Sequence, residues 1–154
     1  MIETRLKAIK TKDLLFVVLY TALLTIGVAV LLGLIDFMLY KYLQVQLGSL
    51  MFWGLAFMTG NLIRKQYETP HLAYSIITGL GLLLAAVIIE VLPIVLIFAG
   101  PESFFSILFD LRIYWDYALQ LYNPVHWVVY FDFNYLITLL MIAVGTYLGV
   151  KRTY

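Results

Sequence analysis

The chain contains no cysteine, which excludes disulfide bonds, thiol catalysis and cysteine-ligated metal sites. It also carries little charge: 12% of its 154 residues are Asp, Glu, Lys or Arg, whereas 64% are hydrophobic. With a mean hydropathy of +0.97, this composition is too apolar for a soluble domain of this size. The charges form no basic run that would indicate nucleic-acid binding. We therefore expect the lipid bilayer to be the solvent of this protein.

Four long apolar runs predict four membrane-spanning helices, at about residues 14–36, 47–63, 72–98 and 129–150. Helices are expected because hydrocarbon offers no hydrogen-bond partner to a backbone N–H or C=O group, and a helix pairs these groups within itself. The alternating ten-residue segments of a membrane barrel are missing from the sequence. The four runs and their connections use the whole length, so no soluble catalytic domain is expected. The sequence thus predicts an all-α membrane protein with one polytopic domain over 1–154.

The distribution of basic residues predicts the orientation of these spans. If both termini are cytoplasmic, eight of the ten Lys and Arg residues lie inside: Arg5, Lys7, Lys10, Lys12, Arg64, Lys65, Lys151 and Arg152. Only Lys41 and Arg112 then lie outside, which fits the positive-inside rule. The chain also has no Asn-X-Ser/Thr acceptor site. We expect a multi-pass protein of a bacterial inner membrane, with both the N-terminus and the C-terminus inside.

Small residues recur four positions apart in the predicted spans, as at Ala56 and Gly60 in the second and Gly145 and Gly149 in the fourth. This spacing lets two helix backbones approach closely. We expect such pairs to pack helices within one molecule rather than to form a dimer interface.

The segment at about 102–122, between the third and fourth spans, is rich in aromatic residues. As one helix it would place Phe104, Leu111 and Trp115 on the same face, so we interpret it as an interfacial helix on the outer leaflet. The expected interfacial anchors are Trp115, Tyr122 and Trp127. A lid or a partner-docking surface is the alternative. The dipeptide Asn123–Pro124 predicts the start of a further helix, since it offers an N-cap and a first-turn proline.

Glu90 is the most informative charged residue because it lies about 18 residues, or about 27 Å, into the third span. An ionised side chain is costly there, so Glu90 is expected to be protonated, paired or next to a wet cavity. Asp36 ends the first span, and Asp132 and Asn134 begin the fourth, so all four side chains can reach a similar depth. They form the predicted ion or substrate site.

Three interpretations of Glu90 remain open from the sequence. It can pair with Arg112 or Lys41 and hold the aromatic segment on the bundle, it can bind a proton, a cation or a polar substrate, or it can contact another subunit. His71 and His126 are expected near opposite membrane faces, which excludes a two-histidine metal site within one chain. No nucleophile motif or phosphate loop is present, so we predict no catalytic residue, metal or cofactor.

Residues Glu90–Val95 read Glu-Val-Leu-Pro-Ile-Val. This stretch resembles the ion-binding helix of rotary ATP synthase subunit c, where a membrane glutamate precedes a similar Leu-Pro-Ile sequence. The resemblance covers about ten residues, and the chain has twice that subunit's number of spans and lacks its glycine-repeat first helix. What the resemblance implies is limited to Glu90, which would bind a proton or Na⁺.

Three functions fit these features. The first is a non-catalytic subunit or scaffold of a larger membrane assembly, favoured by the small size and the aromatic segment. The second is an oligomeric transporter or channel protomer that uses the outer carboxylates for a proton, a cation or a polar substrate. The third is a membrane-embedded enzyme that acts on a lipid, for which only Asp132, His126 and Asp36 are available. The expected partners are the lipid bilayer and either another membrane protein or further copies of this chain.

Overall fold

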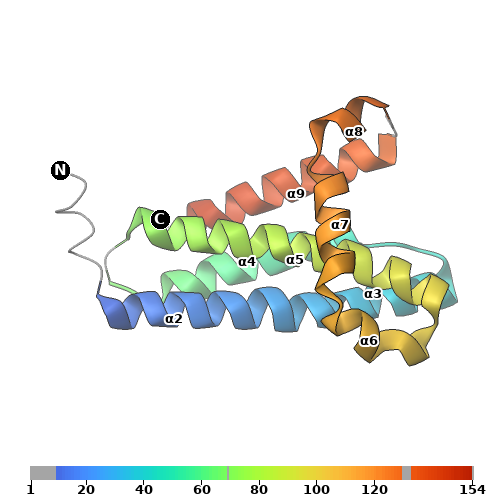
Figure 1. The fold of residues 1–154 in the computed structure, drawn as a ribbon. Helices are drawn as coiled ribbons and strands as arrows, with labels where there is room; N and C mark the ends of the chain where they lie inside the picture. Colours follow the sequence, from blue (N-terminus) through green and yellow to red (C-terminus); the bar gives the residue numbers. More distant parts are fainter. Residues whose placement is uncertain (1–9, 69, 130–132, 154) are drawn as a thin grey trace.

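The computed structural model describes residues 10–68, 70–129 and 133–153, and every regular element in this part of the chain is a helix. The predicted all-α class is therefore confirmed. Long helices run along one another in alternating directions, and a shorter one crosses over them (Figure 1). The bounds of the long helices are α2 (Thr11–Ala22), α3 (Ala29–Leu43), α4 (Gly48–Arg64), α5 (Leu72–Ala99) and α9 (Phe133–Arg152).

Three helical stretches are long and apolar enough to cross a membrane. They are Thr11–Leu43, Leu72–Ala99 and Phe133–Arg152, with mean hydropathies of 2.6, 2.9 and 1.7. These stretches support a membrane protein with transmembrane helices. The remaining long helix, α4, has 17 residues and is about 25 Å long, the lower limit for a spanning helix.

The first stretch is one continuous helix because α2 passes into α3 through a π-helical turn, η1 (Leu23–Val28). The side chain of Thr25 donates to the backbone carbonyl of Thr21 over 2.7 Å, so it supplies a donor where the widened turn disturbs the usual ladder. Gly81 of α5 packs directly against both threonines, and a Cβ at Gly81 would collide with the Thr21 methyl group. The close contact between the first helix and α5 thus depends on this glycine.

The first helix runs beyond the predicted end of its span at Asp36 and stops at Leu43. It ends because Gln44 adopts a left-handed conformation with φ of 56°, and the Gln44 N–H bonds to the carbonyl of Tyr40 over 2.9 Å. The turn that follows leads back into α4 at Gly48.

Helices α4 and α9 run in the same direction and touch through their backbones. A Cβ at Gly60 would collide with the carbonyl oxygen of Gly149, and a Cβ at Gly149 would lie 2.9 Å from the carbonyl oxygen of Ala56. The ring of Phe52 occupies the space beside Gly145. The expected intramolecular role of these small residues is therefore confirmed.

The aromatic segment forms several short helices rather than the single one expected. They are η2 (Pro101–Ser103), α6 (Phe104–Phe109), α7 (Leu111–Leu121) and α8 (Pro124–Val129). The break falls at Asp110, whose side chain accepts a hydrogen bond of 3.1 Å from the Arg112 N–H and so caps a new helix. Helix α7 then crosses the bundle at a steep angle (Figure 1).

This break changes which residues of the segment face the bundle. Tyr114 and Leu121 are buried, whereas Leu111 and Trp115 are 78% and 66% exposed. Tyr114 and Leu121 thus form the packed face of α7, and Leu111 and Trp115, which were expected to face the outer leaflet, point away from the bundle. Tyr122 donates to the Leu83 carbonyl over 3.0 Å and attaches the end of α7 to α5.

The predicted helix start at Asn123–Pro124 is confirmed. The Asn123 side chain accepts from the Val125 N–H over 3.0 Å, and Pro124 is the first residue of α8. The side chain of Trp127, a predicted anchor, lies outside the described part of the chain.

Candidate functional site

Asp36 of α3 and Glu90 of α5 converge on Gly48, the first residue of α4. A methyl group built on Gly48 would lie 3.2 Å from Oδ2 of Asp36 and 3.5 Å from Oε1 of Glu90. Two atoms cannot be further apart than the sum of their distances to a third point, so these oxygens lie within about 7 Å of each other. Two carboxylates from different helices therefore share one place.

Asp36 reaches this place because the chain turns back on itself after α3. The side chain of Asp36 accepts a hydrogen bond of 2.6 Å from the Leu47 N–H, immediately before α4 begins. The first amides of a helix lack intrahelical partners and carry a partial positive charge, which favours a carboxylate beside them. Asp36 is only 4% exposed. The hydrogen bond between Asp36 and Leu47 thus fixes both the turn and the position of the Asp36 carboxylate.

A cavity of about 230 Å³ opens between α3, α4, α5 and α9 at this point. It is lined by Asp36, Gln46, Gly48, Ser49, Glu90, Pro93, Ile94, Asn134, Ile137 and Thr138. We call it the carboxylate cavity. Because a water molecule takes about 30 Å³, it has room for several waters or for a small hydrated cation.

The carboxylate cavity brings together three of the four predicted site residues, Glu90, Asp36 and Asn134. Asp132 lies outside the described residues. The sequence did not indicate that Gly48 and Ser49 are site residues, because their position follows from the turn after α3. Thr138 carried a weak signal, since it lies one helical turn after Asn134 and so on the same face.

The two predicted charge partners point elsewhere. In the part of the chain that the structure describes, neither Arg112 nor Lys41 forms an ion pair with Glu90, and both are exposed. The ammonium group of Lys41 lies 5.9 Å from the ring centre of Phe37. Among the described residues that line the cavity there is no lysine, arginine or histidine. The carboxylates are therefore not neutralised by a basic side chain of this lining.

Helix α7 brings Tyr117 and Tyr122 close enough to Glu90 to feel its charge. Burial, and to a smaller extent the negative charge of Glu90, raises the pKa of Tyr117 to about 12. The Tyr117 phenol consequently stays protonated at physiological pH and keeps its O–H as a donor. A second cavity of about 300 Å³ separates Tyr117 and Asp116 from Val91 and Ile94 of α5.

The chemistry open to the carboxylate cavity follows from its charges. Two ionised carboxylates no more than about 7 Å apart repel by at least about 2 kcal/mol at an effective dielectric constant of 20. A proton or a bound cation removes this repulsion, and the cavity oxygens of Asn134, Thr138 and Ser49 can serve as additional ligands. Among the described residues, no group of three or more His, Cys, Asp and Glu residues is suited to hold a metal ion.

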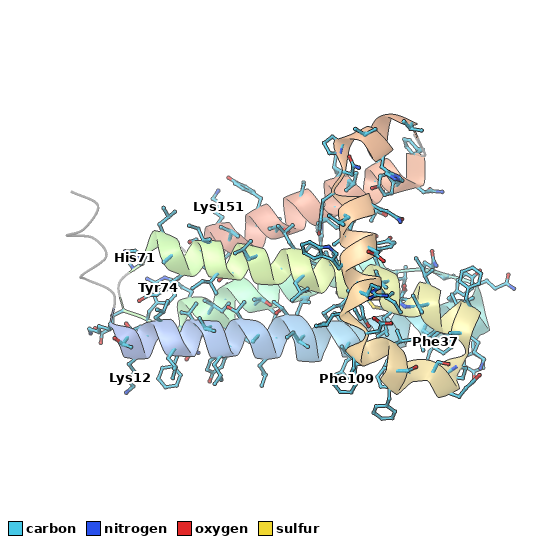
Figure 2. All side chains as sticks on the ribbon, in the orientation of Figure 1. Lys12, Phe37, His71, Tyr74, Phe109 and Lys151 are labelled. Atoms are coloured by element: carbon cyan, nitrogen blue, oxygen red, sulfur yellow. The ribbon has the colours of Figure 1, made fainter. Side chains whose placement is uncertain are left out.

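The two ends of the bundle differ in charge. Figure 2 shows Lys12, His71 and Lys151 at one end, where Lys10 also pairs with Glu68 over 2.9 Å. Phe37, from the helix that carries Asp36, lies towards the opposite end. We call these the inner and the outer end.

Comparison of the chain with family models, with curated proteins and with solved structures finds no match.

Proposed function

We propose that this protein binds a proton or a small cation in the carboxylate cavity, as one protomer of a membrane transporter or channel. The observation that carries this proposal is the convergence of Asp36 and Glu90 on Gly48 without a basic residue in the lining. A buried pair of carboxylates is costly in a membrane unless it is protonated, paired or hydrated. Four helices rarely enclose a pathway alone, so the active form is an oligomer of this chain.

The proposal includes four spans with both termini inside. Helix α4 supports it, because Gly48 lies beside Glu90 at the outer end and Arg64 lies at the inner end, so α4 covers the same depth as residues 72–90 of α5. The cytoplasmic placement of the Lys10 and Lys151 ends follows the positive-inside rule. A bacterial inner membrane is the location proposed with this topology.

Labelling of introduced cysteines tests the topology, since the native chain has none. Cysteines replacing Lys10, Lys65 or Lys151 are expected to resist an impermeant thiol reagent in intact cells. A cysteine replacing Glu102 is expected to react and serves as the positive control. Labelling of the Lys65→Cys variant from outside would overturn the four-span topology.

Ion binding is tested with the purified full chain in liposomes that contain a pH-sensitive dye. Under an imposed Na⁺, K⁺ or pH gradient, proton or cation movement is expected from the wild type and about tenfold less from Glu90→Gln. Gly48→Ala places a methyl group between the two carboxylates and is expected to reduce the flux similarly while leaving the fold intact. Glu102→Gln, which neutralises an exposed carboxylate elsewhere, is the matched control. Equal flux from all four proteins would contradict the proposal.

A second candidate function is a non-catalytic subunit of a membrane assembly. It is favoured by an outer extension, which we define as residues 37–43 of α3, 91–99 of α5, and α6. Helix α4 begins beside Glu90, and Asn134 of α9 lines the same cavity, so this extension projects about two turns beyond both helices. Its exposed side chains include Met38, Tyr42, Leu43, Phe98, Phe105 and Phe109.

Purification in mild detergent distinguishes the two candidates. A stoichiometric membrane-protein partner that is lost in a Phe98→Ser, Phe105→Ser variant would support the subunit function. A homogeneous oligomer of this chain alone would support the transporter or channel.

A further inference from the structure

The inner half of the bundle contains a layer of buried threonine side chains. Thr21 of α2, Thr59 of α4 and Thr78 of α5 are 4%, 0% and 0% exposed. Nothing in the carboxylate cavity involves them, because that cavity is lined by other residues near the outer end. We call these three residues the hydroxyl layer.

The register of the helices puts the three threonines at one depth. A buried cluster at the inner end contains Val17, Ile63, Tyr67 and Tyr74. Thr21 follows Val17 by four residues, Thr78 follows Tyr74 by four, and Thr59 precedes Ile63 by four. Because α4 runs opposite to α2 and α5, each step is one helical turn towards the outer end on the same helix face (Figure 1). The three threonines therefore lie at about the same depth, in the layer above the cluster.

The hydroxyl groups of this layer are not equally satisfied. Oγ1 of Thr78 donates to the Tyr74 carbonyl over 2.8 Å, the usual bond of a threonine within a helix. Among the described residues, the hydroxyl oxygens of Thr21 and Thr59 are fully buried and have no hydrogen-bond partner. Two such groups from adjacent helices in a membrane bundle are costly.

The surroundings of Thr21 add an acceptor and direct its hydroxyl. The methyl group of Thr21 packs onto Gly81, so its hydroxyl points away from that glycine. Thr25, one turn further along, donates to the Thr21 carbonyl and keeps a free lone pair on its own hydroxyl oxygen. A small molecule between Thr21 and Thr59 would thus have two unpaired hydroxyl groups as partners.

We propose that one water molecule binds between Thr21 and Thr59 and is the hydrogen-bond partner of both hydroxyl groups. A buried water with two to four polar partners is a stable part of many structures, whereas a dry site would leave both hydroxyls unpaired. This site is distinct from the carboxylate cavity. Twelve residues of α5, about 18 Å, separate Thr78 from Glu90, and buried Leu82 and Ala85 lie between them.

Valine replaces threonine at nearly constant volume and removes only the hydroxyl group, so it tests the shared water. Thr21→Val and Thr59→Val are each expected to lower the unfolding temperature in detergent by about 3 °C, because a water with only one hydroxyl partner is no longer held and the remaining hydroxyl then stays unpaired. The double variant is expected to lose no more than either single variant. Thr78→Val is the matched control. The decrease in unfolding temperature that it causes is expected to add to the decrease caused by Thr21→Val.

Two outcomes of these substitutions would overturn the proposal. A rise in unfolding temperature in both single variants would mean that the site is dry. Losses that add in the double variant would mean that each hydroxyl bonds separately within its own helix.

Water-edited solid-state NMR on the wild type in lipid provides a test that does not depend on folding of the variants. Magnetisation transfer from water is expected at Thr21 and Thr59 but not at Leu82. Equally slow transfer at all three residues would contradict the bound water.

Discussion

At the outer end of the bundle, Asp36 and Glu90 face a cavity, whereas towards the inner end Gly60 and Gly149 bring two helix backbones into contact. Helix α9 takes part in both regions. Its buried residues Ile142, Gly145 and Gly149 lie between its midpoint and its inner end, and the stretch before Ile142 is largely exposed. Figure 1 shows α9 moving away from the other helices towards this exposed end.

This difference indicates how a small bundle can keep a polar cavity. Close packing needs small residues that let backbones touch, and these are placed in the inner half of α4 and α9. Where α9 separates from the bundle, the space is lined by polar groups of Asn134 and Thr138. The inner contact then fixes the angle at which α9 leaves, and this angle opens the cavity.

The largest expected effect comes from disturbing the inner contact. Gly60→Ala is expected to destabilise the protein by about 1–3 kcal/mol, because the new methyl group collides with the Gly149 carbonyl and separates α4 from α9. Thermal unfolding in detergent measures the change.

Gly54→Ala is the matched control, since it lies on the same helix and has nothing within 4 Å of its Cβ position. It is expected to be neutral or to stabilise by up to about 1 kcal/mol, the difference in helix propensity. Equal losses in the two variants would mean that the inner contact does not hold α9.

A smaller effect is expected from neutralising Glu90. Glu90→Gln removes the repulsion with Asp36 and breaks no ion pair with a basic residue in the described part of the chain, so the free energy of unfolding is expected to stay constant or to rise by about 1 kcal/mol. Arg112→Gln alters an exposed side chain, and its effect on the free energy of unfolding is expected to add to that of Glu90→Gln. A double-mutant cycle with a coupling above about 1 kcal/mol would instead establish an ion pair between the two residues.

The smallest effect is expected at the inner surface, where Lys10 and Glu68 form an ion pair although their side chains are 64% and 82% exposed. The hydrogen bond and charge of Lys10 hold the pKa of Glu68 below its ordinary value of 4.5. The contribution of ionised Glu68 to the free energy of unfolding is therefore complete above pH 4.5. It is lost as the pH falls through the folded-state pKa of Glu68. Solvent screens this pair, so Glu68→Gln is expected to leave the unfolding temperature at pH 7 unchanged within error.

Much of this architecture could be predicted from the sequence. Run length and hydropathy predict the long helices, since a chain in hydrocarbon must satisfy its backbone within each segment. The common depth of Glu90, Asp36 and Asn134 follows from counting residues along those helices. Small residues spaced by four predicted close helix contacts within the molecule, whereas the pairing of Gly60 with Gly149 is known only from the structure.

Other features depend on the three-dimensional turn and could not be predicted. Asp36 contacts Leu47 across eleven residues, and this contact exists only because Gln44 reverses the chain in a conformation that its sequence does not signal. The π-helical turn at Leu23–Val28 arises beside Gly81 of another helix. Asp110 is a possible N-cap in the sequence, but the apolar residues on both sides favoured an unbroken helix.

Infrared spectroscopy of the protein in lipid shows whether Asp36 and Glu90 share a proton or a cation. In cation-free buffer, we expect the C=O stretching band of a protonated carboxyl group, which disappears in Glu90→Gln and persists in Glu102→Gln. Addition of the cation found in the flux assay is expected to weaken this band. A wild-type spectrum without the band, unchanged by Na⁺, K⁺ or ammonium, would mean that the two carboxylates share neither a proton nor a cation.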